Sequence, residues 1–133
     1  MTEFVSENVK VKAPASKVFD FLGDFTNFEN LMPEQIKNWK ADTDTCSFTI
    51  EGMANLSMRI AERHEAKNIH IVADGRNPID YTIDCHLKPK DDDSCNVELV
   101  FAADLNPLTK ALAARPLQNF VDMMALKLQN HFS

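Results

Sequence analysis

The phenol of Tyr81 is the side chain best suited to polar chemistry inside an apolar site. Tyr81 alternates with Ile83 and Cys85, which places the three side chains on one face of an expected strand. We expect this face to be buried, and a buried phenol needs a hydrogen-bond partner: a ligand oxygen or, more commonly, a backbone carbonyl or a water. Cys85 has no basic neighbour that would activate its thiol, so we expect it to act as a small apolar side chain.

The other residues with catalytic or metal-binding potential form no recognised motif. The four histidines, at positions 64, 70, 86 and 131, lie on separate segments without an HExxH pair, and three glycines cannot build a phosphate-binding loop or a GxSxG turn. We therefore assign no catalytic residue, no metal and no cofactor. A cyclase or dehydratase that works with one tyrosine, one histidine and a shaped cavity stays open as an alternative.

Composition limits the organisation and the partners of the chain. Its 133 residues, 44% of them apolar, suffice for a single domain over 1–133 with one core. A formal net charge of -6 without a basic cluster disfavours nucleic acid as a partner. No apolar run is long enough to cross a bilayer, no secretory signal opens the chain, and the three cysteines lack disulfide or zinc spacing. We expect a cytoplasmic protein without stable membrane insertion.

The first third of the chain changes from strand to helix periodicity. Residues 4–11 alternate as one strand that ends before Pro14. A helix follows over residues 15–23, where apolar side chains share a face. A second short helix over residues 24–31 has apolar residues at every third position and ends before Pro33.

Alternation of period two then predicts strands near Trp39 and over residues 48–50, 56–60, 69–73, 79–87 and 97–105. With the first strand, these make an antiparallel meander of about seven strands, because the short polar loops leave no room for crossover helices.

The last segment is predicted to form one long amphipathic helix. Asn106 is a good cap, Pro107 suits the first turn, and an apolar stripe continues to Phe132. Pro116 removes one internal hydrogen bond, which predicts a kink or break near Arg115. Such a break either joins two packed helices or loosens the helix as a gate for a ligand.

This order of elements resembles the START-like superfamily, also described as the polyketide cyclase and dehydrase or SRPBCC group. The resemblance is carried by VKAPASKVFDFLGDFTNFENLMP at the front, by the alternating strands between residues 46 and 105, and by NPLTKALAARPLQNFVDMMALKLQNHF at the end. It implies an α+β helix-grip fold, in which a curved antiparallel sheet and a long C-terminal helix enclose an apolar cavity. Family members include lipid and hormone carriers, polyketide cyclases and co-chaperone domains, so the resemblance leaves the activity open.

The inward parity of the central strands and the apolar stripe of the last helix nominate the residues that would contact a ligand in this cavity. They are Phe48, Ile50, Met58, Ile60, Ile71, Tyr81, Ile83, Leu99, Phe101, Leu112, Phe120 and Met124. Alternation does not distinguish a hollow interior from a filled core.

The resulting functional hypothesis is a monomer or weak dimer that binds a small apolar or amphipathic molecule without transforming it. The portal is expected near Pro116. A polyketide cyclase or dehydratase is the first alternative, and a protein-interaction module of the co-chaperone kind is the second.

Overall fold

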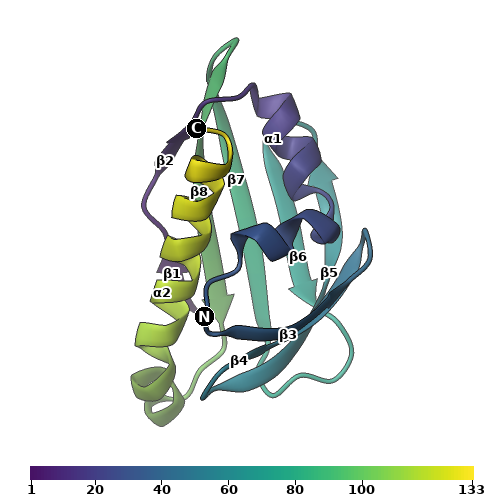
Figure 1. Ribbon diagram of the computed structural model, residues 1–133. Coiled ribbons are helices and arrows are strands. Elements are labelled where there is room, and N and C mark those ends of the chain that lie inside the picture. Colours follow the sequence, from purple (N-terminus) through teal and green to yellow (C-terminus); the bar gives the residue numbers. More distant parts are fainter.

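The computed structural model describes residues 1–133 as an eight-stranded antiparallel sheet with three helices on one face (Figure 1). The strands are β1 (Thr2–Val5), β2 (Val9–Val11), β3 (Ile36–Ala41), β4 (Thr45–Ile50), β5 (Ala54–His64), β6 (Asn68–Ala73), β7 (Tyr81–Asp91) and β8 (Ser94–Ala103). Their order in the sheet is β1-β8-β7-β6-β5-β4-β3, and β2 also pairs with β8. The predicted helix-grip sheet is confirmed, with eight strands in place of about seven.

The long hairpin of β7 and β8 shows how alternating residues build the sheet. Ile83 lies opposite Phe101 and Cys85 lies opposite Leu99, and all four side chains are buried. The residues between them on both strands are half-buried and face the outer side. The period of two therefore gives the sheet one apolar concave face and one polar convex face.

The N-terminal segment forms two strands, not the single strand expected over residues 4–11. Both β1 and β2 pair with β8, and Ser6 lies between them in the interruption. The buried Ser6 hydroxyl accepts from the amide of Leu99 at 2.9 Å and donates to the carbonyl of Glu7 at 2.9 Å. A side chain that bonds to the backbone in this way offers an alternative to the regular ladder, which explains the break.

Two short helices follow, as the sequence predicts: α1 (Ala15–Leu22) and the 3₁₀ helix η1 (Phe25–Leu31). The side chain of Asp24 caps η1 by accepting from the amide of Thr26 at 2.9 Å. Arg63 on β5 joins this region to the sheet, because its guanidinium donates twice to the carbonyl of Gly23, at 3.2 and 2.7 Å.

The C-terminal helix α2 (Pro107–His131) begins after Asn106, whose side chain accepts from the amide of Thr109 at 2.8 Å. It continues without interruption through Pro116, so of the predicted kink or break near Arg115 the break is wrong. Proline has no N–H, so the carbonyl of Leu112, four residues earlier, lacks its helical donor. Because Leu112 lies on the exposed side of the helix, water can bond to this carbonyl and the helix can continue. None of the helices combines the length and the apolarity that a membrane span requires.

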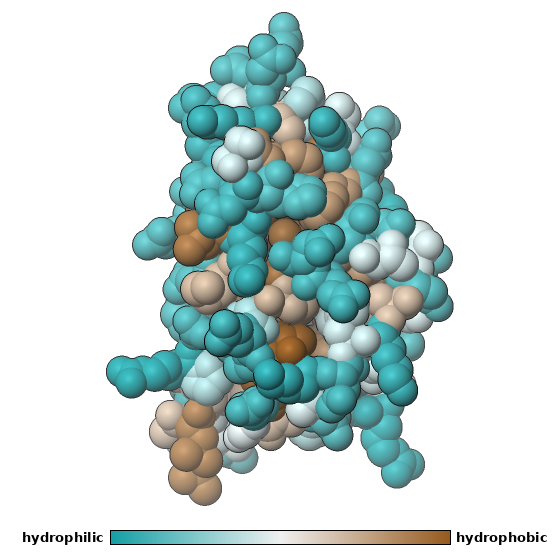
Figure 2. All heavy atoms as spheres, in the orientation of Figure 1, coloured by the Kyte–Doolittle hydropathy of each residue, from teal (hydrophilic) through white to brown (hydrophobic).

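The core lies between the concave face of the sheet and the helices. It is one cluster of 36 buried residues to which every strand and helix contributes. α2 contacts β8, β1, β2 and η1, whereas α1 contacts β6 and β7. Figure 2 shows a largely hydrophilic surface with apolar atoms at the centre of the helical face, between α2 and β3.

Candidate functional site

The predicted ligand-contacting residues come together in the core, with one exception. The eleven buried ones are Phe48, Ile50, Met58, Ile60, Ile71, Tyr81, Ile83, Leu99, Phe101, Phe120 and Met124. Leu112 is 74% exposed, so the expectation that it faces the interior is wrong. Leu112 lies five residues before the buried Leu117, so the two side chains leave the helix about 140° apart. Leu112 therefore faces solvent where Leu117 faces the core.

Seven aromatic rings form a continuous series through this interior. Phe25 meets Phe28 at 5.0 Å between ring centroids, Phe28 meets Trp39 at 6.4 Å, and Trp39 meets Phe48 at 5.5 Å. The series continues across to α2 and back to the sheet, because Phe120 lies 6.0 Å from Phe48 and 6.1 Å from Phe101, which stacks on Tyr81 at 5.2 Å. Edge and offset contacts of this kind stabilise a core beyond the apolar area that they bury. They also present flat apolar surface from η1 to β7.

Sequence reasoning did not nominate Phe25, Phe28 or Trp39 for this site. Phe25 and Phe28 were expected on the second short helix, over residues 24–31, and their spacing of three, which puts both on one side of a 3₁₀ helix, was the signal that both turn inward. Trp39 lies on β3 beside a change of register between Lys37 and Lys40. The intervening Asn38 adopts a positive φ of 56°, and alternation along the sequence does not reveal such a bulge.

The polar end of the series is the phenol of Tyr81. It donates a hydrogen bond to the backbone carbonyl of Ser57 at 2.8 Å. Of the three partners expected from the sequence, a backbone carbonyl is therefore the one in this structure. Burial is the main reason that the pKa of Tyr81 is raised above its usual value, and the nearby Cys46 and Asp74 add to the effect. Burial likewise raises the pKa of the Cys46 thiol. Both groups are therefore neutral at physiological pH.

The histidines lie outside the core, and two of them, His70 and His86, belong to one polar network on the convex face. His70 Nδ1 lies 2.7 Å from a carboxylate oxygen of Asp84, and Asn68 bridges towards His86 at 3.2 Å. His64 pairs with Glu62 at 3.5 Å on the neighbouring strand. No three histidine, cysteine or acidic side chains of the protein converge in a way that suits a metal ion.

None of the five main pockets opens into the core, so the structure shows the filled interior, which the sequence left open beside the cavity that the family resemblance implies. The main pockets are hollows of the surface, and Phe48 is the only one of the twelve predicted residues that lines any of the five. Half-buried apolar side chains border the core, among them Met32, Trp39 and Met53. The predicted residues thus form an apolar interior that is closed in this structure.

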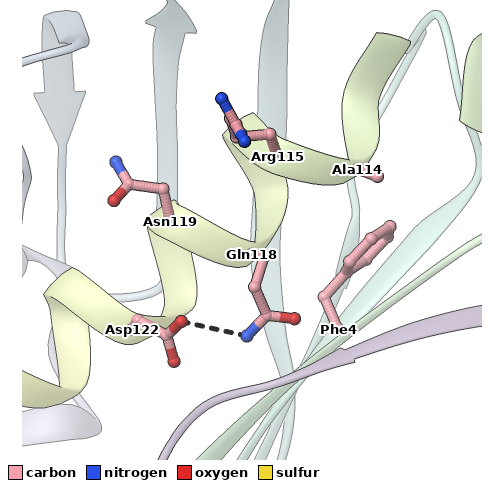
Figure 3. A pocket seen from close by; sticks show the side chains of 6 residues that line it. All are labelled: Phe4, Ala114, Arg115, Gln118, Asn119 and Asp122. Carbon is pink, nitrogen blue, oxygen red and sulfur yellow. Dashed lines mark hydrogen bonds between the residues drawn. The ribbon is translucent and has the colours of Figure 1, made fainter. Parts of the chain in front are cut away.

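One surface hollow of about 510 Å³ lies where the sequence places the portal. Its lining comes from β1 and from α2 on either side of Pro116: Phe4, Ala114, Arg115, Gln118, Asn119 and Asp122 (Figure 3). Gln118 Nε2 donates to the carbonyl of Val5 at 2.9 Å and to Asp122 at 3.1 Å. Asp122 also accepts from the amide of Glu7 at 3.2 Å. These bonds fasten the middle of α2 to the edge of the sheet.

A curved antiparallel sheet closed by a long C-terminal helix over an apolar interior defines a START-like, helix-grip domain. The chain belongs to the family described as polyketide cyclase / dehydrase and lipid transport, whose model matches residues 2–132.

Solved structures show the same fold. The chain is similar to the protein XoxI from Bacillus cereus, with a TM-score of 0.77 and 12% identity over 99% of this chain and 96% of that one. A START superfamily protein from Mycobacterium smegmatis gives 0.70 and 16%, over 98% and 96%. The di-domain ARO/CYC BexL gives 0.74 and 18%, over 98% of this chain and 46% of that one. No curated protein matches the sequence.

Proposed function

We propose that this chain binds a small apolar or amphipathic molecule between the concave face of the sheet and α2, and holds it without transforming it. The observation that carries the proposal is the continuous series of aromatic rings from Phe25 to Tyr81. Ligand sites are lined mainly by apolar and aromatic side chains, with a few polar groups that fix orientation. The phenolic oxygen of Tyr81 would be that polar group, accepting a hydrogen bond from the ligand.

A ligand has to replace side-chain contacts, because the interior is packed in this structure. The stacked pair Phe48 and Phe120 joins β4 to α2, so its separation would open the interior between them. The neighbouring Met58 and Met124 are unbranched and buried, and methionine side chains adjust to new shapes at low cost. Each square ångström of apolar ligand surface removed from water would contribute about 25 cal/mol. A small ligand is favoured, since a larger one would displace more of the core.

The cyclase or dehydratase alternative requires a group that transfers a proton inside the interior. The ionisable candidates there are Tyr81 and the thiols of Cys46, Cys85 and Cys95, and the raised pKa of each keeps it protonated at neutral pH. None of them is therefore prepared to act as a base. This electrostatic setting favours binding over catalysis.

The interaction-module alternative would need an exposed anchor. The exposed large apolar side chains are aliphatic, and no aromatic residue is among them. Because tryptophan and tyrosine are prominent anchors of protein interfaces, the lack of an exposed aromatic side chain disfavours that alternative.

We also propose a cytoplasmic setting and a monomeric or weakly dimeric state. Three free, buried cysteines support the reducing compartment.

Native mass spectrometry of the freshly purified protein, followed by denaturation of the same sample, tests the proposal. We expect a discrete non-covalent mass that is lost on denaturation. A titration with the amphipathic aromatic probe 1-aminoanthracene should quench Trp39, the single tryptophan, whose ring lies 5.5 Å from Phe48.

Two variants of equal added bulk localise the binding. Met124→Phe enlarges a fully buried side chain and should weaken probe binding by about tenfold, because it occupies the space of the ligand. Leu112→Phe enlarges an exposed side chain and should leave binding unchanged. A clean protein mass together with no saturable quenching would overturn the proposed function.

A further inference from the structure

The first two turns of α2 carry apolar side chains that nothing in the protein covers. Leu108 and Leu112 are each 74% exposed, and the first buried residue of the helix is Ala113. This end of α2 extends past the neighbouring strands in Figure 1, and Figure 2 shows apolar atoms protruding at the same corner. Exposed leucines in such a position are costly in water and point to a binding role.

The two leucines share one side of the helix with positive charge beside them. Leu108 and Leu112 are four residues apart, so they are neighbours on the helix surface. Arg115 follows on the same side, seven residues after Leu108, whereas Lys110, two residues from each leucine, lies on the opposite side of the helix. The four ion pairs of the structure involve neither cation. The helix N-terminus adds a partial positive charge of its own.

We propose that this end of α2 docks reversibly on the surface of an anionic lipid bilayer. Leu108 and Leu112 would enter the boundary between headgroups and acyl chains, while Arg115 on the same side of the helix would face anionic headgroups. The net charge of -6 repels such a surface from the rest of the molecule, so this end alone would approach it. Asp104 lies close before the helix, which makes the expected preference for anionic lipid modest.

The small area of the patch favours a bilayer over a second copy or another protein. A stable protein interface buries about 1,200–2,000 Å² in total, far more than two leucine side chains supply. A bilayer sets no such threshold, because each apolar side chain enters an existing apolar medium and each nearby cation adds its own attraction. The inference does not depend on a bound ligand. If the proposed function holds, this end would also be the place where ligand is exchanged with lipid.

Flotation with vesicles tests the docking. The full chain should float with vesicles of phosphatidylcholine and phosphatidylserine at a ratio of 7:3, and less with phosphatidylcholine alone. Leu108→Ser with Leu112→Ser should lower the bound fraction at least tenfold. Leu126→Ser is the matched control, because Leu126 is also exposed, at 44%, but lies near the other end of α2. Arg115→Glu should lower binding to the anionic vesicles selectively, and Lys110→Glu, on the opposite side of the helix, should lower it less.

A fluorescent label reports which residue enters the bilayer. Leu112→Cys, coupled to a nitrobenzoxadiazole fluorophore, should brighten with anionic vesicles, whereas Leu126→Cys should not. The native thiols are buried and have raised pKa values, so they should react slowly with the label.

Three results would overturn the inference. The first is no vesicle binding at millimolar lipid, and the second is undiminished binding by the double serine variant. The third is a concentration-dependent dimer that the serine variant abolishes while vesicles stay unbound, which would assign the patch to a second copy. Since vesicle binding is measured without added ligand, its failure leaves the proposed interior site untouched.

Discussion

Phe48 on β4 and Phe120 on α2 stack ring against ring, with centroids 6.0 Å apart and planes inclined by 24°. This contact spans the interior, because the backbone of α2 runs along β8, β1 and β2, at the opposite edge of the sheet from β4. Phe120 also meets Phe101 edge-on, at 6.1 Å and 81°. One side chain of the helix thus connects both parts of the concave face, and closure of the interior depends on it.

Replacing Phe120 by alanine should destabilise the fold by about 3–5 kcal/mol, because it removes a fully buried ring and leaves a cavity behind. Urea unfolding followed by circular dichroism measures the change. Leu112→Ala, on the exposed side of the same helix, should change the free energy of unfolding by less than about 0.5 kcal/mol. Equal effects of the two substitutions would contradict the assignment of Phe120 to the closure of the interior.

Tyr81→Phe should cost about 1 kcal/mol of stability, since it deletes the hydrogen bond to the carbonyl of Ser57, which keeps only its bond from the amide of Asp74. If the phenolic oxygen orients the ligand, the variant should also bind a hydroxylated aromatic probe more weakly than a hydrocarbon probe of the same shape. Calorimetric titration with 2-naphthol and naphthalene compares the two. An equal loss for both probes would show that Tyr81 acts only through packing.

Arg63→Ala should destabilise the protein by about 1 kcal/mol, because the carbonyl of Gly23 loses two donors at the end of α1. The arginine is partly exposed, which limits the effect. Arg59→Ala on the same strand is the control, since its exposed pair with Asp74, at 3.8 Å, contributes little. In thermal unfolding, Arg63→Ala should have a lower midpoint temperature than Arg59→Ala. The reverse order would exclude this role for Arg63.

Stability should fall as pH rises above about 9. Burial raises the pKa of the Cys85 thiol from 9.0 to about 12, and the charge of Asp84 adds to the shift. Between these two pH values the unfolded thiol ionises while the folded one stays protonated, so the unfolded state is stabilised relative to the folded state and the free energy of unfolding falls. Denaturation midpoints from pH 8 to pH 11 should decline for the wild type and less steeply for Cys85→Ala. Parallel declines would argue against this cause.

Much of the fold could be predicted because the sheet has one apolar face. Ile83 and Phe101 were expected to point inward from alternation alone, and the structure pairs them across β7 and β8. Asn106 and Pro107 likewise marked the start of α2, since cap residues act within one turn and need no distant partner.

The errors arose where distant contacts or the exact helical angle decide the outcome. Leu112 belonged to a run of apolar residues, yet its angle from Leu117 turns it to solvent. Pro116 was expected to break a helix whose lost hydrogen bond falls on the exposed side. Ser6 interrupts the first strand through a bond to Leu99, 93 residues away. Packing of the interior could not be predicted, because a filled core and a lined cavity require the same alternation.

Methyl NMR of methionine tests the interior binding site most directly. The six methionines include Met58 and Met124, both fully buried in the core, and Met1, which is 72% exposed. On titration with 1-aminoanthracene, the methyl signals of Met58 and Met124 should shift saturably and show intermolecular contacts with the probe, whereas Met1 should not respond. Saturable binding that leaves both buried methyl groups unchanged, or no binding at all, would contradict a ligand site between the sheet and α2.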